Sequence, residues 1–556
     1  MNKLRYKNKI VVALLFLMNA MVGMSQTNVT SRFVQEKVVL TTDRTLYFAG
    51  EQILLKVNCI LPESKDSLSR VAYVELLDKR SKPILQKKLL VVSGAASTVI
   101  SIPEEVITGN YYLRGYTQYM RNFDANTLYT TELTVINPEL PAKEAIQTVI
   151  DSTRSFNKGK EIVTVSTADS SFLPNSLITL ELKGKDNTNV SVSVVKKGSY
   201  DPLTVGIQNY FQSGASVKSV NKLNWYPEIR AVSISGKVLD KSNGQPLRNI
   251  FVYASTIDSA KQFHVVRTNE DGLFIFSLTN LHENHVVYIC AEFDATILVN
   301  ADFAEKLPPV NYRTVKMDSA KRVLMNEMYE NAQVSDIYRE ERVPSKTYAD
   351  TVPDPFKSTT EKLFLKDYVP LPLFSDYFKE IIPYTRIKSR KEGPQIQLVD
   401  RRSKEFFEHP LILIDNIPFH DHGALLSIPP SKINSVDVIA SKYVFGKEIL
   451  NGVVIVKTKE GNLGGLPLPN DVVSVDYITY DPMMSLPPEK ENNYTISKPG
   501  LKNTLYWNEE VMLKDGHQTI QFYSSNYLSD YDVVIRGVDE EGEEFTQIKT
   551  ITISNK

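Results

Sequence analysis

Histidine and cysteine are the residue types in this sequence best suited to bind a metal or act as a nucleophile, and the chain has seven histidines and two cysteines. The densest group is His420-Asp421-His422, where two imidazoles would face the same way on a strand. No third or fourth ligand is close in the sequence, so we predict no metal site there. Residues 282–285, His-Glu-Asn-His, are one residue short of the zinc motif H-E-x-x-H. They precede a strand instead of lying on a helix, so we interpret them as a surface loop.

Three other patterns were weighed for chemistry. Ser155 with Lys158 and Ser193 with Lys196 fit S-x-x-K, but neither pair has the S-D-N or K-T-G partners of the hydrolases that use it. The glycine-rich segment 461–465 lacks the Lys-Ser/Thr of a phosphate loop, and we interpret it as a hinge. The aromatic residues that could form a binding face, about half of which a sandwich would place in its core, are Tyr111, Tyr112, Tyr116 and Tyr119.

These comparisons leave no nucleophile, acid–base pair or cofactor motif. We therefore predict no catalytic, cofactor-binding or metal-binding residues, no cofactor, and a protein that is not an enzyme. Cys59 and Cys290 fall in different predicted domains, so we expect two buried thiols and no disulfide. The chain has 64 Lys and Arg against 65 Asp and Glu, a net charge of -1. This balance lacks the basic surface that nucleic-acid binding needs, so we predict no nucleic-acid partner.

The N-terminal segment predicts export. MNKLRYKNK is basic and is followed by the apolar run IVVALLFLMNAMVGM, which is too short to span a bilayer. Small residues near Gly23 and Ser25 offer a cleavage site, so we interpret residues 1–25 as a signal peptide, with a membrane anchor as the alternative. No later run of about 18 apolar residues follows, and we expect no transmembrane segment after signal removal.

Residues 33–137 consist of short β-rich runs separated by turn residues, which is typical of a β-sandwich. The segment resembles the macroglobulin-type sandwich of bacterial envelope proteins, and the matching positions are Asp43, Arg44, Tyr47, Gly50, Glu51, Gly109, Tyr111, Leu113, Arg114 and Tyr116. We expect Asp43 and Arg44 to form an ion pair at the end of the sandwich. Residues 138–230, with the strands SLITLELK and NVSVSVVKK, predict a second sandwich that resembles the next macroglobulin-like repeat.

A third sandwich is predicted over residues 231–300. Asn243-Gly244 and Asp271-Gly272 supply the positive φ angles that tight turns require. With the preceding strand these turns resemble the carboxypeptidase-regulatory, transthyretin-like sandwich, which accompanies a catalytic domain in peptidases and has no active site of its own. Residues 301–370 predict a linker after an amphipathic helix, whose apolar face is formed by Leu324, Met325, Met328 and Ala332.

Residues 371–465 predict an α+β unit in the order helix, two strands, helical turn, two strands. The unit resembles the plug domain of TonB-dependent outer-membrane receptors, and the segments that carry the resemblance are Pro410–Asp415, Ile428–Ile433, Val436–Val438, Phe445-Gly446 and Asn451–Lys459. Such plugs usually have glycine where this chain has Asn416. Because asparagine tolerates the left-handed region, we expect the turn to survive.

A receptor plug sits inside a barrel of about 22 strands, and about 9 to 11 residues per strand require on the order of 200 strand residues. Only 95 residues follow Gly461 in this sequence, so we expect no barrel after the plug-like domain. Residues 466–556 alternate polar and apolar positions and predict a C-terminal sandwich.

The predicted fold is mainly β: serial β-sandwiches of the Ig/macroglobulin-like and transthyretin-like kinds, with one small α+β plug-like domain. The resemblances imply a non-enzymatic protein of the cell envelope, exported to the periplasm or associated with the outer membrane. Its role would be an accessory or interaction subunit of an outer-membrane complex, of receptor or secretion type, whose plug-like domain docks a barrel protein or another envelope complex. The alternative is a secreted or surface macroglobulin-like binder of peptides, proteases or carbohydrate. A peptidase, the third hypothesis, lacks a catalytic constellation.

Overall fold

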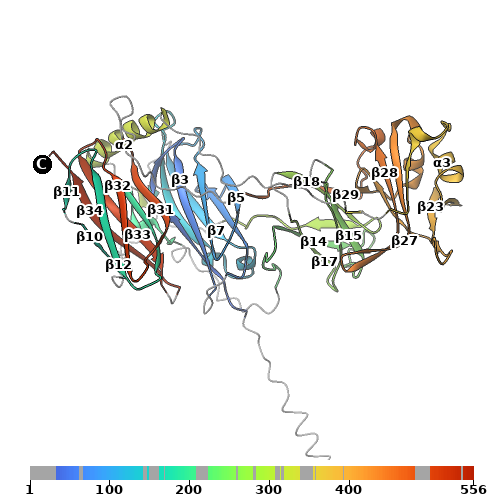
Figure 1. Ribbon diagram of the computed structural model, residues 1–556, viewed down its shortest axis with the longest axis horizontal. Coiled ribbons are helices and arrows are strands. Elements are labelled where there is room, and N and C mark those ends of the chain that lie inside the picture. The colour runs from blue at the N-terminus through green and yellow to red at the C-terminus, as the bar shows by residue number, and fades with distance from the viewer. Residues whose placement is uncertain are drawn as a thin grey trace, which may run out of the picture.

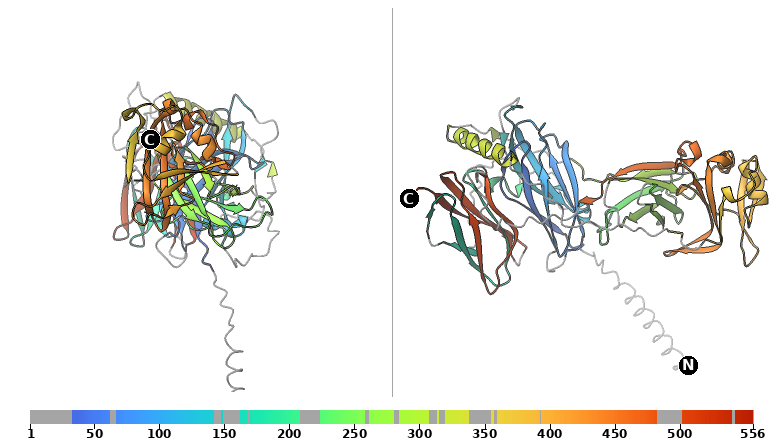
Figure 2. Two further views of the ribbon diagram at one scale, coloured as in Figure 1. Left: turned by 90° about the vertical axis from the view of Figure 1, so that its right-hand side faces the viewer. Right: turned by 45° about the horizontal axis from the view of Figure 1, so that its top comes forward.

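The computed structural model describes residues 33–61, 67–141, 147–148, 162–167, 169–207, 223–257, 261–279, 284–306, 313–314, 319–337, 355–356, 359–391, 393–481, 501–539 and 542–555. The molecule is elongated, and four bodies follow one another along its long axis (Figure 1, Figure 2). We call them, in chain order, the first, second and third sandwiches and the α+β unit. Along the axis the second sandwich lies at one end, followed by the first, the third and the α+β unit. The chain is mainly β, as predicted.

The first sandwich packs two sheets around a core of alternating apolar residues. One sheet has the order β1-β3-β6, with β1 (Lys37–Thr42), β3 (Gln52–Ile60) and β6 (Ala95–Ser101). The other has the order β2-β8-β7-β4-β5-β30, with β2 (Leu46–Phe48), β8 (Tyr129–Ile136), β7 (Gly109–Tyr116), β4 (Val71–Leu77), β5 (Pro83–Leu90) and β30 (Tyr480–Asp481). The last strand comes from the segment predicted to belong to a C-terminal sandwich, so that prediction was wrong for β30.

The second sandwich is assembled from two segments more than 300 residues apart in the sequence. Its smaller sheet joins β10 (Val163–Ser166), β12 (Leu177–Gly184) and β32 (His517–Tyr523). Its larger sheet has the order β11 (Ser171–Phe172), β34 (Glu544–Ile553), β33 (Ser529–Val538), β13 (Asn189–Lys196) and β31 (Thr504–Met512). Residues 138–230 and 466–556 were predicted to form two separate sandwiches, and that prediction was wrong. The two segments together form one sandwich. Each of the two sheets contains strands from both segments, so neither segment forms a sandwich alone.

The third sandwich likewise takes a strand from a distant part of the chain. Its sheets are β17-β14-β19 and β16-β15-β18-β29, formed by β14 (Ser233–Leu239), β15 (Phe251–Ser255), β16 (Phe263–Arg267), β17 (Leu273–Ser277), β18 (His285–Ala291), β19 (Thr296–Val299) and β29 (Val472–Tyr477). β29 lies outside the predicted boundary at residue 300. Gly244 and Gly272 adopt φ angles of 69° and 73°, which confirms both predicted turns.

The helix α2 (Ser319–Ile337) confirms the predicted amphipathic segment. Met328 is fully buried against Leu46 and Phe48 of the first sandwich, with Leu324, Met325 and Ala332 packed around it. α2 also contacts the second sandwich, where Lys196 forms an ion pair of 2.7 Å with Glu327. The helix thus spans two sandwiches. Most of the linker predicted after it lies outside the described residues.

The α+β unit contains two sheets and short helices. The larger sheet has the order β21-β27-β28-β25-β26, with β21 (Glu361–Phe364), β27 (Ile433–Phe445), β28 (Glu448–Thr458), β25 (Leu411–Ile414) and β26 (Ile417–Pro418). The smaller sheet joins β22 (Thr385–Arg390), β23 (Gly393–Val399) and β24 (Phe406–Phe407), and the α-helices are α3 (Phe374–Glu380) and α4 (His422–Leu426). β22 was not predicted. β21 belongs to this unit, so the predicted boundary at residue 371 was too late.

Two short strands, β9 (Gln147–Thr148) and β20 (Arg313–Thr314), pair with each other. In the part of the chain that the structure describes, the 3-10 turns are Tyr119–Asn122, Ala125–Thr127, Pro202–Thr204, Leu365–Asp367, Pro430–Lys432 and Leu463–Gly465. Among the residues that the structure describes, no helix is long and apolar enough to cross a membrane. The predicted signal peptide, residues 1–25, lies outside the described part of the chain.

Candidate functional site

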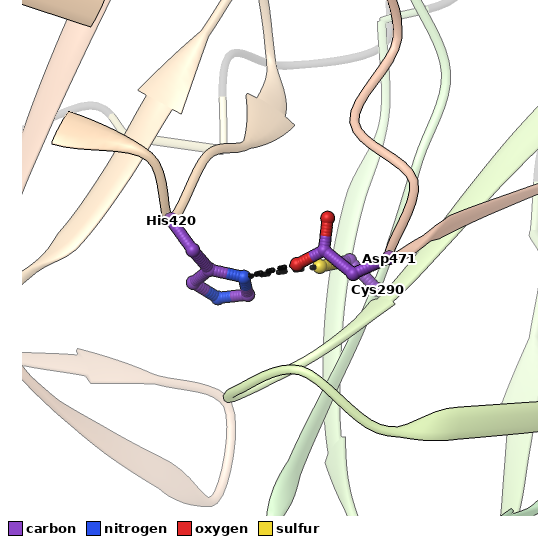
Figure 3. A group of neighbouring side chains, drawn as sticks. All are labelled: Cys290, His420 and Asp471. Carbon is purple, nitrogen blue, oxygen red and sulfur yellow. Dashed lines mark hydrogen bonds and ion pairs between the residues drawn. The ribbon is translucent and has the colours of Figure 1, made fainter. Parts of the chain in front are cut away.

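The candidate site is a cluster of Cys290, His420 and Asp471 where the third sandwich meets the α+β unit (Figure 3). The antiparallel register of β18 and β29 pairs Cys290 with Val472, so the preceding residue, Asp471, lies beside the thiol. His420 comes from the α+β unit, in the turn between β26 and α4. Three segments of the chain, brought together by strand pairing and domain packing, therefore supply one side chain each.

The distances within the cluster show one strong polar contact and one loose one. Nδ1 of His420 lies 2.5 Å from Oδ2 of Asp471, which is a short hydrogen bond. Sγ of Cys290 lies 4.0 Å from the same nitrogen and donates to the carbonyl of Ala291 at 3.3 Å. Cys290 is completely buried, whereas 34% of the His420 side chain is exposed. The cluster therefore reaches from the core to the surface.

Burial and charge affect the two acidic groups in opposite directions. Burial, reinforced by the negative charges of Asp471 and Asp294, raises the pKa of the Cys290 thiol well above its usual range. The hydrogen bond from His420 lowers the pKa of Asp471. At neutral pH the cluster therefore contains a protonated thiol and an ionised carboxylate.

This geometry does not match a nucleophilic triad. In a triad the histidine accepts the nucleophile's proton at one ring nitrogen and is oriented through the other by the acid. Here Cys290 and Asp471 both face Nδ1 of His420, and the thiol is buried with a raised pKa. A thiol, an imidazole and a carboxylate facing one point are instead the donor types that bind a transition metal.

The structure separates the histidines that the sequence placed together. Nδ1 of His422 accepts a hydrogen bond of 2.9 Å from the amide of Ile396, which ties α4 to β23. Burial lowers the pKa of His422 to about 4, so its imidazole is neutral. Asp421 caps α4 by accepting from the amide of Ala424 at 2.9 Å. Only His420 belongs to the cluster, and the sequence contained no signal for its two partners.

The other predicted motifs have structural roles where they are described. His285 begins β18 and is buried, whereas His282, Glu283 and the pair Ser155 and Lys158 lie outside the described residues. Ser193 and Lys196 are both buried on β13, where the ammonium of Lys196 pairs with Glu327 of α2. The odd spacing sends the two side chains to opposite faces of the strand.

The predicted hinge was wrong, and the tyrosines considered for a binding face lie in the interior. Residues 461–465 form a tight turn, because Asp415 accepts from the amide of Leu463 at 2.9 Å and Lys432 donates to the carbonyl of Gly464 at 2.9 Å. The four tyrosines considered for a binding face are all buried with at most 7% exposure: Tyr111, Tyr112, Tyr116 and Tyr119. Three of them lie on β7, and Tyr119 lies in the 3-10 turn that follows it.

The predicted ion pair of Asp43 and Arg44 is confirmed and belongs to a larger buried network. Arg44 lies 3.5 Å from Asp43 and 3.0 Å from Glu51, and its guanidinium stacks over Tyr47 at 4.5 Å. Thr504 of the second sandwich donates to Asp43 at 2.6 Å. Asn503 donates to Glu51 at 3.0 Å. The motif positions that suggested a macroglobulin-type domain therefore hold the first and second sandwiches together.

Asn416 adopts a φ angle of 77°, which confirms that the turn survives without glycine. Its side-chain amide donates to two carbonyls of the third sandwich, those of Thr256 at 2.9 Å and Gln262 at 2.7 Å. Glycine could adopt the turn but could not form these bonds. The departure from the plug-like pattern thus fixes the α+β unit to the third sandwich.

No family model and no curated protein sequence matches the chain. Among solved structures it is similar to Escherichia coli α2-macroglobulin activated by porcine elastase, at 8% identity and a TM-score of 0.25, over 94% of this chain and 44% of that one. Salmonella α2-macroglobulin reacted with methylamine gives 8% identity and a TM-score of 0.24, over 94% and 39%. The Escherichia coli adhesin FdeC gives 11% and 0.15, over 50% and 64%. The chain spans less than half the length of these macroglobulins, and similarity at this level assigns no function.

Proposed function

We propose that this chain is a non-enzymatic, exported protein of the bacterial cell envelope, and that it serves as an interaction subunit of an outer-membrane complex. In this proposal the sandwiches form an arm, and the α+β unit at its end docks a barrel protein or another envelope complex. The observation that carries the proposal is the placement of the α+β unit alone at one end of an elongated molecule (Figure 1).

The path of the chain supports a rigid arm. After the α+β unit the chain returns through β29, which completes a sheet of the third sandwich, and β30, which pairs with β5 of the first. It then supplies β31 to β34 of the second sandwich. Each sandwich therefore contains strands from both directions of the chain. β29 ends at Tyr477 and β30 begins at Tyr480, so the connection between the third and first sandwiches is short and restricts their relative motion.

Side-chain packing also fixes the α+β unit to the arm. Phe251, Tyr253 and Phe263 of the third sandwich form one cluster with rings of the α+β unit, and the ring centroids of Phe263 and Phe356 are 5.3 Å apart. Arg267 pairs with Glu448 at 2.9 Å across the same junction. Apolar burial on this scale resists separation of the two bodies.

The segment before α3 is the surface that we propose to meet the partner. It reads YVPLPLF from Tyr368, and Val369 and Leu373 are 80% and 59% exposed. Its two prolines hold the backbone extended and remove hydrogen-bond donors. Leu373 is the N-cap of α3, which lies at the far end of the molecule (Figure 1). Exposed apolar side chains at the tip of an arm are suited to contact another protein.

The absence of enzymatic activity is part of the proposal. The cluster of Cys290, His420 and Asp471 has a buried, protonated thiol and two groups facing the same imidazole nitrogen. Neither feature suits a nucleophile that must reach a substrate.

Site-specific photo-crosslinking in intact cells tests the docking role. A photoreactive residue at Val369 or Leu373 is expected to capture an outer-membrane barrel protein. The matched control is Leu177, which is 49% exposed on β12 in the second sandwich, at the other end of the arm. Capture of the same barrel protein from all three positions contradicts the proposal. Failure to capture a barrel protein from any position also contradicts it. Release of the protein into the medium would favour the alternative, a secreted binding protein.

A further inference from the structure

The thiol of Cys290, the imidazole of His420 and the carboxylate of Asp471 converge from three elements (Figure 3). Cys290 lies on β18, Asp471 directly precedes β29, and His420 lies across the junction in the α+β unit. Within the described ranges, this is the one group of three or more His, Cys, Asp or Glu residues whose donor atoms all lie within 4.8 Å of one another.

We propose that these three side chains bind a divalent transition-metal ion, with Zn²⁺ as the best match to the donor set. Thiolate and imidazole are the ligands that zinc prefers, and a carboxylate is a common third ligand. Mg²⁺ and Ca²⁺ instead prefer sites made of oxygen ligands. The thiolate and the carboxylate together carry two negative charges, which neutralise a divalent cation.

Of the two donor distances from Nδ1 of His420, one is longer and the other shorter than the donor–donor distances of a tetrahedral metal site. Metal–ligand bonds of about 2.0 to 2.3 Å place neighbouring tetrahedral donors about 3.3 to 3.8 Å apart. Sγ of Cys290 is 4.0 Å from Nδ1 of His420, and Oδ2 of Asp471 is 2.5 Å from the same nitrogen. A metal bound between His420 and Asp471 replaces the hydrogen bond that joins them. The two donor atoms must then move apart by about 1 Å to reach the spacing around a metal.

The surroundings permit this movement at His420. Cys290 is held inside β18, whereas the His420 side chain is 34% exposed in a turn, so its ring can adjust and a water molecule can complete the coordination. Cysteine binds a metal as its thiolate, so binding displaces the proton of the Cys290 thiol.

A metal bound here would join the third sandwich directly to the α+β unit. Two ligands belong to the paired strands β18 and β29, and His420 belongs to the unit on the other side. Occupancy is therefore expected to hold the two bodies together more firmly. This inference does not depend on which partner the α+β unit binds.

The test is a titration of the reduced, metal-free full chain with Co²⁺, followed by Zn²⁺. We expect one equivalent of Co²⁺ to bind with a thiolate-to-cobalt charge-transfer absorption, and Zn²⁺ to displace it. We also expect Zn²⁺ to raise the melting temperature of the wild-type protein, because the metal binds only the folded site.

Two cysteine variants provide a matched comparison. Cys290→Ser is expected to abolish the charge-transfer absorption, whereas Cys59→Ser is expected to retain it, because Cys59 is the other buried free cysteine and lies in the first sandwich. His420→Ala and Asp471→Asn change partly exposed side chains, so both should fold. Loss of a residue that only supports a metal ligand weakens metal binding by roughly 10- to 100-fold. Because His420 and Asp471 would bind the metal directly, each variant is expected to weaken binding by more than that.

Three outcomes would overturn the proposal. The first is a wild-type chain that binds neither metal. The second is a charge-transfer absorption that persists in Cys290→Ser. The third is an affinity that neither His420→Ala nor Asp471→Asn changes.

Discussion

The two outer junctions of the molecule differ in the kind of contact that holds them together. The junction between the first and second sandwiches is polar, with Arg44 enclosed by Asp43 and Glu51 and hydrogen bonds arriving from Asn503 and Thr504. The junction between the third sandwich and the α+β unit is aromatic, with a few polar contacts at its edge. We call them the polar junction and the aromatic junction.

This difference predicts how each junction fails. Buried charges are costly when one partner is lost, because the remaining charge has no solvent to stabilise it. Truncation of a buried apolar side chain lowers stability in proportion to the apolar area that is removed and the cavity that is left. A single change of charge should therefore destabilise the polar junction. A change of side-chain volume should destabilise the aromatic junction.

The largest effect is expected for Arg44→Ala in the polar junction. The change leaves Asp43 and Glu51 buried without a counter-charge, at a cost of about 3 to 5 kcal/mol. Urea unfolding followed by the fluorescence of Trp507, in a Trp225→Phe background, measures it. The control Arg248→Ala removes an exposed pair with Glu270 and is expected to change stability by no more than about 0.5 kcal/mol. Equal effects of the two variants would remove the basis of the comparison.

The next effect is expected for Leu450→Ala in the aromatic junction. Leu450 is buried in the cluster that joins β28 to the third sandwich, and its truncation should cost about 2 to 4 kcal/mol. Increased hydrogen exchange in both β16 and β28 would report the loss. The neighbouring variant Ile449→Ala changes a side chain that is 53% exposed and should leave exchange in β16 unchanged. Loss of protection confined to β28 would show that this cluster does not couple the two bodies.

A pH change is expected to affect two regions in opposite directions. Burial raises the pKa of Glu228, which lies where the first sandwich meets the third, to about 7. Burial lowers the pKa of His422 in the α+β unit to about 4. Between pH 7 and 4.5 the folded state takes up a proton at Glu228 before the unfolded state does, so acidification stabilises this region. Between pH 6.5 and 4 the unfolded state takes up the proton at His422 first, so acidification destabilises the α+β unit.

Hydrogen exchange, corrected for intrinsic rates, separates the two responses. From pH 6.5 to 5, protection of residues 228–233 should rise and that of the Ile396 amide, which donates to His422, should fall, each by on the order of 2 kcal/mol. Glu228→Gln and His422→Asn cannot titrate and should each abolish one response. A response that survives its own variant must arise from another group.

The smallest effect is expected for Asn416→Gly at the edge of the aromatic junction. Glycine keeps the positive φ angle and loses only the bonds to Thr256 and Gln262, at about 1 to 2 kcal/mol. Asn416→Ala loses the same bonds and adds backbone strain, so it should be less stable by about a further 1 kcal/mol. Thermal unfolding of both variants measures the difference. A glycine variant as stable as the wild type would show that these two bonds contribute nothing to docking.

Local patterns predicted the elements of this fold well. The alternation in NVSVSVVKK is visible within a few residues and became β13, and the apolar spacing of Leu324, Met325 and Met328 became α2. The turns at Gly244 and Gly272 follow from residue type alone. The ion pair of Asp43 and Arg44 was likewise predicted from adjacent residues.

Long-range pairing was not predictable in the same way. β29 and β30 look like any other strand in the sequence, and nothing near Val472 indicates that its partner is Cys290. The candidate site depends on that pairing, because it brings Asp471 to a cysteine 181 residues away in the chain. His422, which is close to His420 in the sequence, instead contacts β23 through the amide of Ile396.

Composition, period-two alternation and turn residues by themselves determined a mainly-β chain with one α+β unit, because strand and turn preferences depend on neighbouring residues. Only the tertiary structure decided which strands share a sheet, which domain each segment completes, and which side chains meet at the junctions. Those choices depend on burying the apolar face of one segment against another hundreds of residues away, and a local pattern does not specify which partner will do so.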